Sequence, residues 1–103
     1  MPLTTKAQQL PKSLQNVISL SIQLLDPKQI LLFGSRARNT HRDTSDFDLA
    51  FRGLAKPGEW ARFQAEVGEQ PLTLHKLDLL VYETTSEAYR KNIDAEGVVL
   101  YER

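Results

Sequence analysis

The sequence predicts a single α+β domain over residues 1–103, and two kinds of pattern support this prediction. Apolar residues recur at helical spacing in some segments, whereas other short segments are continuously apolar or alternate between apolar and polar residues, as strands do. A chain of this length buries roughly 60–70% of the surface that its unfolded form exposes, which is enough for one modest core. We therefore expect one small domain in which helices pack against a sheet of short strands.

The first half of the chain predicts a helix, two strands and the turn between them. Apolar residues at helical spacing predict a helix over residues 11–25, and Pro11 occupies a first turn that tolerates proline. The branched and aromatic residues 29–33 predict a fully buried strand that leads into a Gly-Ser turn. The arginine-rich residues 36–43 are predicted to begin as a short helix and to continue as a loop, and residues 46–51 alternate as a second strand.

Two further helices are predicted in the second half. Residues 59–67 carry an apolar stripe with two aromatic residues, which predicts a packing helix, and Gly68 offers a left-handed cap at its end. The aromatic residues of this stripe are predicted to lie in the core and not on a partner-binding face. Thr84 and Glu87 have the spacing of a capping box, so they predict the start of a helix over residues 84–94.

Two more strands complete the predicted sheet. Residues 74–82 form an apolar run that Asp78 interrupts, and alternation places Asp78 and Tyr82 on the same face. After Gly97 ends the preceding helix, residues 98–101 alternate as a last strand. The tyrosines of the chain are predicted to pack and not to be modified: Tyr82, Tyr89 and Tyr101.

Three carboxylates stand out in the predicted strands. Asp46 and Asp48 are two residues apart, so in a strand both side chains project to one face about 6–7 Å apart, a span that two bridged divalent ions can occupy. Asp78 interrupts another apolar strand, and burial of such carboxylates is costly unless a positive charge compensates. These residues predict a metal site, although a lone Asp-x-Asp is also typical of acids at exposed strand ends.

A Gly-Ser turn follows the first buried strand and precedes a helix. Gly34 permits a tight turn and a close approach of the backbone, which can be its whole purpose. Ser35 adds a hydroxyl to the unpaired N–H groups of a helix start, a combination that suits the outer phosphates of a nucleoside triphosphate. Arg36 and Arg38 can add charge to that pocket, or one of them can face solvent or pair with Asp43. The turn and the acids together indicate nucleotide chemistry.

Composition narrows the possible functions. Thirteen Lys and Arg balance thirteen Asp and Glu, so no overall field attracts the protein to nucleic acid or to an anionic membrane. The absence of cysteine excludes disulfides and thiolate metal sites. The first residues lack the apolar core of a signal peptide, and no apolar run approaches the ~20 residues of a membrane span. We expect a cytoplasmic protein, with neither His41 nor His75 in its site.

The motifs together resemble those of a known family. The run Ile30–Arg38 contains the Gly-Ser turn, and ten residues separate Ser35 from Asp46. Together with the Asp-Phe-Asp motif and the later strand that contains Leu77-Asp78, these features resemble the minimal nucleotidyltransferases (MNT) of the DNA polymerase beta superfamily. The similarity covers residues 13–101 and is greatest to the MNT antitoxins that accompany HEPN-domain toxins in prokaryotes. It implies a nucleotidyltransferase fold, in which a small mixed β-sheet has helices packed mainly on one face.

The resemblance also implies a role for each candidate site residue. Three residues would bind the nucleotide: Gly34, Ser35 and Arg38. Three acids would ligate magnesium and act in catalysis: Asp46, Asp48 and Asp78. Two Mg²⁺ ions are expected, with ATP as the substrate, and Asp78 is the candidate to orient or deprotonate the attacking hydroxyl.

A catalytic lobe without a substrate lobe implies that the acceptor arrives on a partner. By the resemblance, that acceptor is a tyrosine hydroxyl of a cognate HEPN ribonuclease toxin, which the protein would silence by AMPylation within a hetero-oligomer, without direct contact to nucleic acid or membrane. One alternative is a non-catalytic antitoxin that neutralises the toxin by binding and occlusion. Transfer of a nucleotide to a small molecule such as an aminoglycoside is a weaker alternative, because such enzymes usually carry an additional domain.

Overall fold

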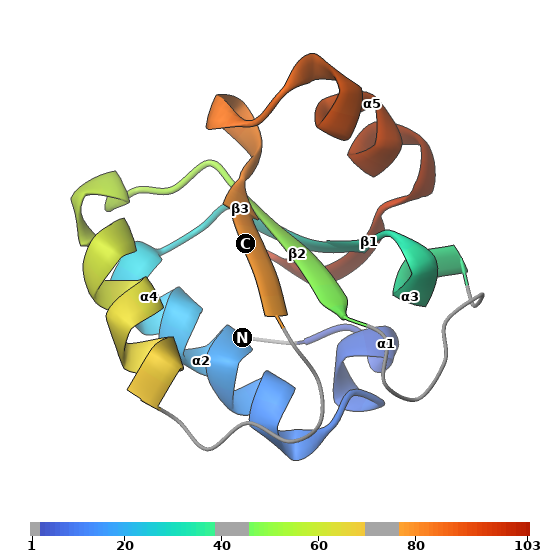
Figure 1. The fold of residues 1–103 in the computed structure, drawn as a ribbon. Coiled ribbons are helices and arrows are strands. Elements are labelled where there is room, and N and C mark those ends of the chain that lie inside the picture. Colours follow the sequence, from blue (N-terminus) through green and yellow to red (C-terminus); the bar gives the residue numbers. More distant parts are fainter. Residues whose placement is uncertain (1–2, 39–45, 70–76) are drawn as a thin grey trace.

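The structure, a computed structural model, describes residues 3–38, 46–69 and 77–103. A four-stranded sheet with the order β3-β2-β1-β4 lies at its centre (Figure 1). The strands are β1 (Gln29–Phe33), β2 (Phe47–Arg52), β3 (Leu77–Val81) and β4 (Val98–Glu102). β1 runs antiparallel to β2 and β4, whereas β2 and β3 are parallel. The prediction of an α+β fold with a small mixed sheet is therefore confirmed.

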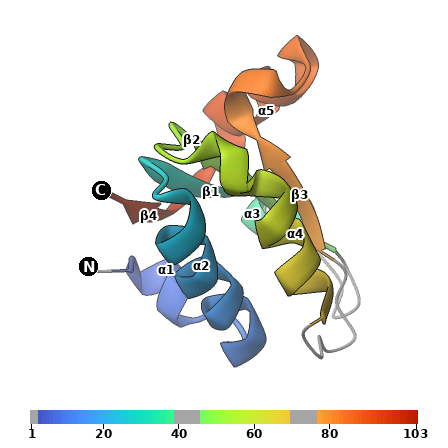
Figure 2. The ribbon, with the colours of Figure 1, turned by 90° about the vertical axis from the view of Figure 1, so that its left-hand side faces the viewer.

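Helices cover both faces of the sheet, and most of the core lies on one of them. The helices are α1 (Thr5–Gln8), α2 (Lys12–Leu25), α3 (Ser35–Arg38), α4 (Trp60–Glu69) and α5 (Glu87–Glu96), with short 3-10 turns η1 (Pro57–Glu59) and η2 (Tyr82–Thr84). α2 and α4 pack on the face with the larger core, and α5 lies across the sheet from them (Figure 2). None of the described helices is long and apolar enough to cross a membrane.

The larger core confirms the apolar stripes read from the sequence. α2 begins after Pro11 and ends at Leu25, and its C-cap Asp26 has a left-handed φ of 47°. On α4, the rings of Trp60 and Phe63 meet the buried ring of Phe51 edge-on, with centroids 5.7 and 5.4 Å apart. Such edge contacts add to the free energy gained from burying the rings. Phe63 is therefore a core residue, as predicted, and the partly buried Trp60 packs against the core.

The smaller core lies between the sheet and α5. Its buried residues are Leu31, Phe33, Ala50 and Ile93, and partly buried residues pack against them. The alternation predicted for β3 is confirmed, because Leu79 packs against the larger core while Leu80 and Tyr82 pack against the smaller one. β3 is an edge strand and only half-buried, so its apolar run does not mark a fully enclosed strand.

Two predicted helix ends differ from the structure. Gly68 does not cap α4 in a left-handed conformation, because it lies inside the helix and the described glycines with positive φ are Gly34 and Gly53. Thr84 does not cap α5, because it belongs to η2 and its hydroxyl donates to the carbonyl of Val81 at 3.3 Å. The predicted loop at 39–43, the start of the third strand at 74–76, His41 and His75 lie outside the described residues.

Ser86 is the true N-cap of α5. Its side-chain oxygen accepts a hydrogen bond from the backbone N–H of Tyr89 at 3.3 Å. Ser86→Ala should lower the free energy of unfolding by about 1 kcal/mol, since it leaves a helix-start N–H without its partner. Thr84→Ala is the matched control and should cost less in urea unfolding. Equal losses in the two variants would contradict the assignment of the cap.

Candidate functional site

The turn after β1 is built around Gly34. Its φ of +75° lies in the left-handed region, where a side chain is strained. A Cβ atom at this position would collide with the Oδ2 carboxylate oxygen of Asp48 on the neighbouring strand. Gly34 therefore both closes the turn into α3 and leaves the space that the Asp48 carboxylate occupies. The close backbone approach predicted from the sequence is present, and the group approached is an acid of the site.

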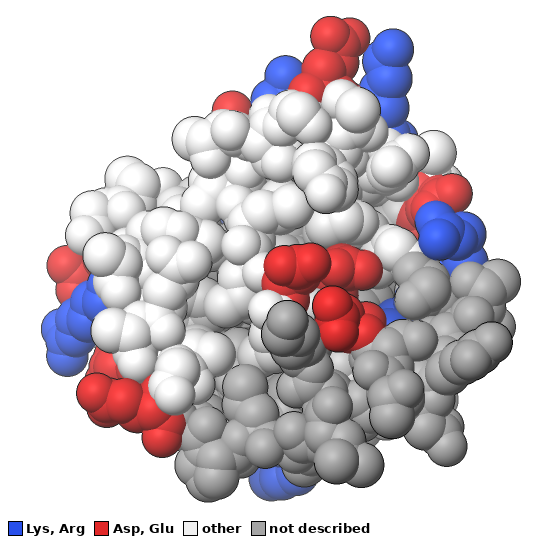
Figure 3. Space-filling view, viewed as in Figure 1, with Lys and Arg blue, Asp and Glu red and all other residues white. Residues whose placement is uncertain are grey.

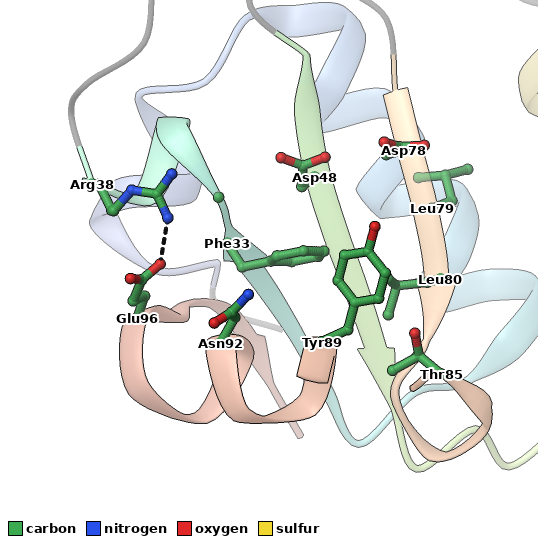
Figure 4. Close-up of a pocket in the computed structure, with 11 residues that line it drawn as sticks. Phe33, Arg38, Asp48, Asp78, Leu79, Leu80, Thr85, Tyr89, Asn92 and Glu96 are labelled. Carbon is green, nitrogen blue, oxygen red and sulfur yellow. Dashed lines mark hydrogen bonds and ion pairs between the residues drawn. The ribbon is translucent and has the colours of Figure 1, made fainter. Parts of the chain in front are cut away.

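Two of the predicted acids lie side by side. Asp48 on β2 pairs with Asp78 on β3 in the parallel register, and both carboxylates reach the same side of the sheet (Figure 4). Figure 3 shows acidic side chains gathered near the centre of this face, over the beginnings of the two strands. The topology thus brings together two residues that are far apart in the sequence.

The environment of Asp48 disfavours its negative charge. Burial is the main cause that raises the pKa of this carboxyl from 3.8 to about 6, and the charge of Asp78, a hydrogen bond with Asp78 and the charge of Asp46 add to the effect. Arg38 opposes the shift. Two neighbouring carboxylates that repel one another in this way provide hard oxygen ligands for a cation.

Asp46 lies one residue outside the strand that was predicted to begin with it. β2 begins at Phe47, so Asp46 precedes the strand and is exposed, although its charge acts on Asp48. Across the described part of the chain, no three His, Asp or Glu side chains form a group that could hold a metal ion. The chemistry of the Asp48 and Asp78 pair fits a divalent cation such as Mg²⁺, and the third ligand stays a prediction.

A pocket of about 490 Å³ opens between this pair of acids and α5. One side is formed by the sheet and the turn at Gly34, and the other by residues of α5 that the sequence analysis did not place in the site: Tyr89, Asn92 and Glu96 (Figure 4). Their spacing puts them on one face of a helix, and this was the sequence pattern from which their common position could have been predicted. That signal is weak, because the same spacing occurs on any solvated helix face.

The two arginines after the turn have different partners. Arg38 lines the pocket, and its Nη1 donates to the Oε2 of Glu96 at 2.7 Å, so it forms an ion pair between α3 and α5 (Figure 4). The guanidinium of Arg36 lies over the ring of Phe47, 4.1 Å from its centroid. Of the two arginines, Arg38 is thus the one that lines this pocket. The alternative partner considered from the sequence, Asp43, lies outside the described residues.

Comparisons with known proteins agree with the motifs and the fold. A chain in the crystal structure of a toxin–antitoxin with AMP-PNP superposes with a TM-score of 0.63 and 22% identity, covering 86% of this chain and 73% of that one. A chain of the MntA-HepT toxin–antitoxin gives a TM-score of 0.56 and 17% identity, covering 89% and 72%. At these identities the likeness shows a shared fold. None of the curated proteins compared with the chain matches it.

The sequence itself matches a family described as polymerase beta, nucleotidyltransferase. The match covers residues 15–103, which include the Gly-Ser turn, all three acids and the whole of α5. The chain belongs to the polymerase beta nucleotidyltransferase family.

Proposed function

We propose that this protein is an antitoxin that transfers AMP from ATP to a tyrosine hydroxyl of a HEPN-domain ribonuclease toxin. The observation that carries the transfer chemistry is the pair of Asp48 and Asp78, which lie together in one pocket, where the turn at Gly34 leaves room for the Asp48 carboxylate. An acidic pair beside a glycine turn suits in-line displacement at a phosphate, where charge must be stabilised on entering and departing oxygens.

Each residue of the site has a task in this proposal. Gly34 and Ser35 would receive the outer phosphates, and Arg38 would add a positive charge from the pocket wall. Three acids would hold two magnesium ions: Asp46, Asp48 and Asp78. Bound Mg²⁺ would supply charge neutralisation at the phosphates. Asp78, on the edge strand, would orient the incoming hydroxyl and accept its proton.

The proposed partner rests on the openness of the pocket and on the structural neighbours. Asp78 is exposed and lies on an edge strand, so a hydroxyl carried by another protein can approach it from solvent. The neighbours come from toxin–antitoxin structures, one of them with AMP-PNP, an ATP analogue. These likenesses support a toxin as the partner and ATP as the donor.

The transfer is tested by the intact mass of the toxin. A HEPN-domain protein that co-purifies with this chain is incubated with it, Mg²⁺ and each nucleoside triphosphate in turn. We expect a gain of one or more AMP units with ATP, absent with the double variant Asp46→Ala, Asp48→Ala. A stable complex with no gain from any triphosphate would favour the alternative, in which the antitoxin acts by occlusion. Protection of cells by the double variant would favour it as well.

Glu96 should weaken nucleotide binding. Its carboxylate engages the guanidinium of Arg38 at 2.7 Å and adds a negative charge to a pocket that would receive a triphosphate. Glu96→Gln should therefore tighten ATP binding by roughly 3- to 10-fold, which is about 1 kcal/mol, as measured by isothermal titration calorimetry at low salt. Glu87→Gln, on the same helix and paired with Lys91, is the control and should change little. Weaker binding by Glu96→Gln would show that the ion pair helps to position Arg38.

A further inference from the structure

Tyr89 is a side chain that the proposed transfer does not use. Within the described residues it is the one large apolar side chain that is exposed, with 51% of its surface accessible. The prediction that it packs is only partly right, because its ring meets Phe33 edge-on, with centroids 6.3 Å apart and an interplanar angle of 74°. The ring is therefore positioned while much of the side chain faces the pocket.

The hydroxyl of Tyr89 is directed toward the paired acids. Figure 4 shows it pointing from α5 toward Asp48 and Asp78, and all three residues line the same pocket. The ring and the backbone of Tyr89 each have a contact that holds them. Phe33, which supports the ring, pairs with Asp48 across β1 and β2, and the N-cap Ser86 accepts from the backbone N–H of Tyr89.

The other tyrosines are placed differently. The hydroxyl of Tyr82 donates to the carboxylate of Asp94, at 2.8 Å from Oδ1 and 3.0 Å from Oδ2. Tyr101 is fully buried in the larger core. Tyr89 is thus the tyrosine that presents its hydroxyl to the acids of the site.

We propose that Tyr89 is a self-modification site, which accepts a nucleoside monophosphate from a triphosphate bound in its own pocket. This inference rests on the proposed function, because it uses the same donor and the same kind of acceptor. The phenol oxygen forms a bond to the α-phosphorus, the bond from that phosphorus to the bridging oxygen breaks, and pyrophosphate leaves. The phenol proton passes to the carboxylate of Asp78, which lines the same pocket.

Modification of Tyr89 has a direct consequence for the site. The product is a phosphodiester that tethers a nucleotide to α5 within a pocket of about 490 Å³. A nucleotide held there covalently occupies the space that a second triphosphate needs. When no partner tyrosine is present, self-modification therefore stops the protein from consuming further nucleotide.

The test uses the purified chain alone, with Mg²⁺ and each nucleoside triphosphate in turn. We expect its intact mass to rise by one nucleoside monophosphate, and peptide fragmentation to place the addition on Tyr89. Tyr89→Phe keeps the ring contact with Phe33 and should lose the addition, whereas Tyr82→Phe should keep it. A thermal melt checks that each variant is folded. An addition that persists in Tyr89→Phe, or maps to another residue, would overturn the inference.

A mixing experiment tests whether the transfer occurs within one molecule. Asp48→Asn retains Tyr89 but lacks a site acid, while Tyr89→Phe has the acids but lacks the acceptor. Mixed with a triphosphate, neither variant should gain mass, and a gain on Asp48→Asn would show transfer between molecules and overturn the own-pocket assignment. The toxin's mass reports the proposed function separately. Two results together would overturn the inference and leave the proposed function standing: the toxin gains AMP, and the wild-type antitoxin incubated without the toxin keeps its mass.

Discussion

Asp48→Asn is expected to abolish nucleotidyl transfer and to make the protein more stable at neutral pH. Transfer should fall by more than about 1,000-fold, because the variant lacks a carboxylate that would bind the Mg²⁺ needed to neutralise charge on the phosphates. This fall corresponds to a loss of several kcal/mol of transition-state stabilisation. Stability should rise because the amide is neutral at a position where burial and Asp78 raise the pKa of the native carboxyl to about 6. The full shift corresponds to about 3 kcal/mol, and since the side chain is partly exposed we expect about 1–2 kcal/mol.

The gain in stability should depend on pH in a defined direction. The folded protein binds the Asp48 proton more tightly than the unfolded chain, whose pKa is near 3.8. This contribution to stability is fully present below pH 3.8 and is lost as the pH rises through about 6. Urea unfolding of both proteins should therefore give similar free energies near pH 4 and the full difference near pH 7.5. If the wild-type protein and Asp48→Asn were equally stable at both pH values, or if Asp48→Asn retained transfer, the role given to this carboxylate would be contradicted.

Gly34→Ala is expected to have the second large effect. The left-handed backbone at φ +75° strains an alanine by roughly 1–2 kcal/mol, and the new methyl group collides with the carboxylate of Asp48. We expect the free energy of unfolding to fall by about 2–4 kcal/mol, and transfer to fall by about 100-fold because Asp48 is displaced. Denaturant unfolding and the rate of the proposed transfer to a toxin measure the two effects.

Gly53→Ala separates backbone strain from damage to the site. Gly53 also has a left-handed φ, +67°, and an added Cβ would lie 2.7 Å from the Cβ of Lys28. It follows β2 at the end opposite to Asp48, so its substitution should lower stability while the folded protein keeps its rate of transfer. The transfer rates of the two variants are compared under conditions where the same fraction of each protein is folded. Equal losses of transfer would show that the close approach of Gly34 to Asp48 is not needed for transfer.

The strands and the paired acids could be predicted because each depends on short stretches of sequence. The run of residues 29–33 is apolar enough to be a buried strand in any context, and the strand parity of Asp78 follows from the alternation of side chains. The register that sets Asp48 opposite Asp78 is a property of the parallel pairing of β2 and β3, which no local pattern specifies. The family resemblance supplied that juxtaposition.

The errors arose where two local signals compete. Thr84 and Ser86 are both good capping residues, and the choice between them depends on the 3-10 turn that continues from β3 and includes Thr84. Gly68 has open space around its α-carbon, so nothing forces the left-handed turn that would end α4 there. The wall of the pocket on α5 was missed because Arg38 and Glu96 are 58 residues apart and meet only in the folded chain.

The two walls of the pocket are attached to the fold very differently. Asp48 and Asp78 belong to strands backed by the larger core, whereas α5 rests on a small cluster to which Ile93 is its buried contribution. A substitution at Asn92, which is exposed on α5 and lines the pocket, would therefore change neither the paired acids nor the larger core. The α5 wall can therefore be altered to change what the pocket accepts while the strands that hold the paired acids keep their places.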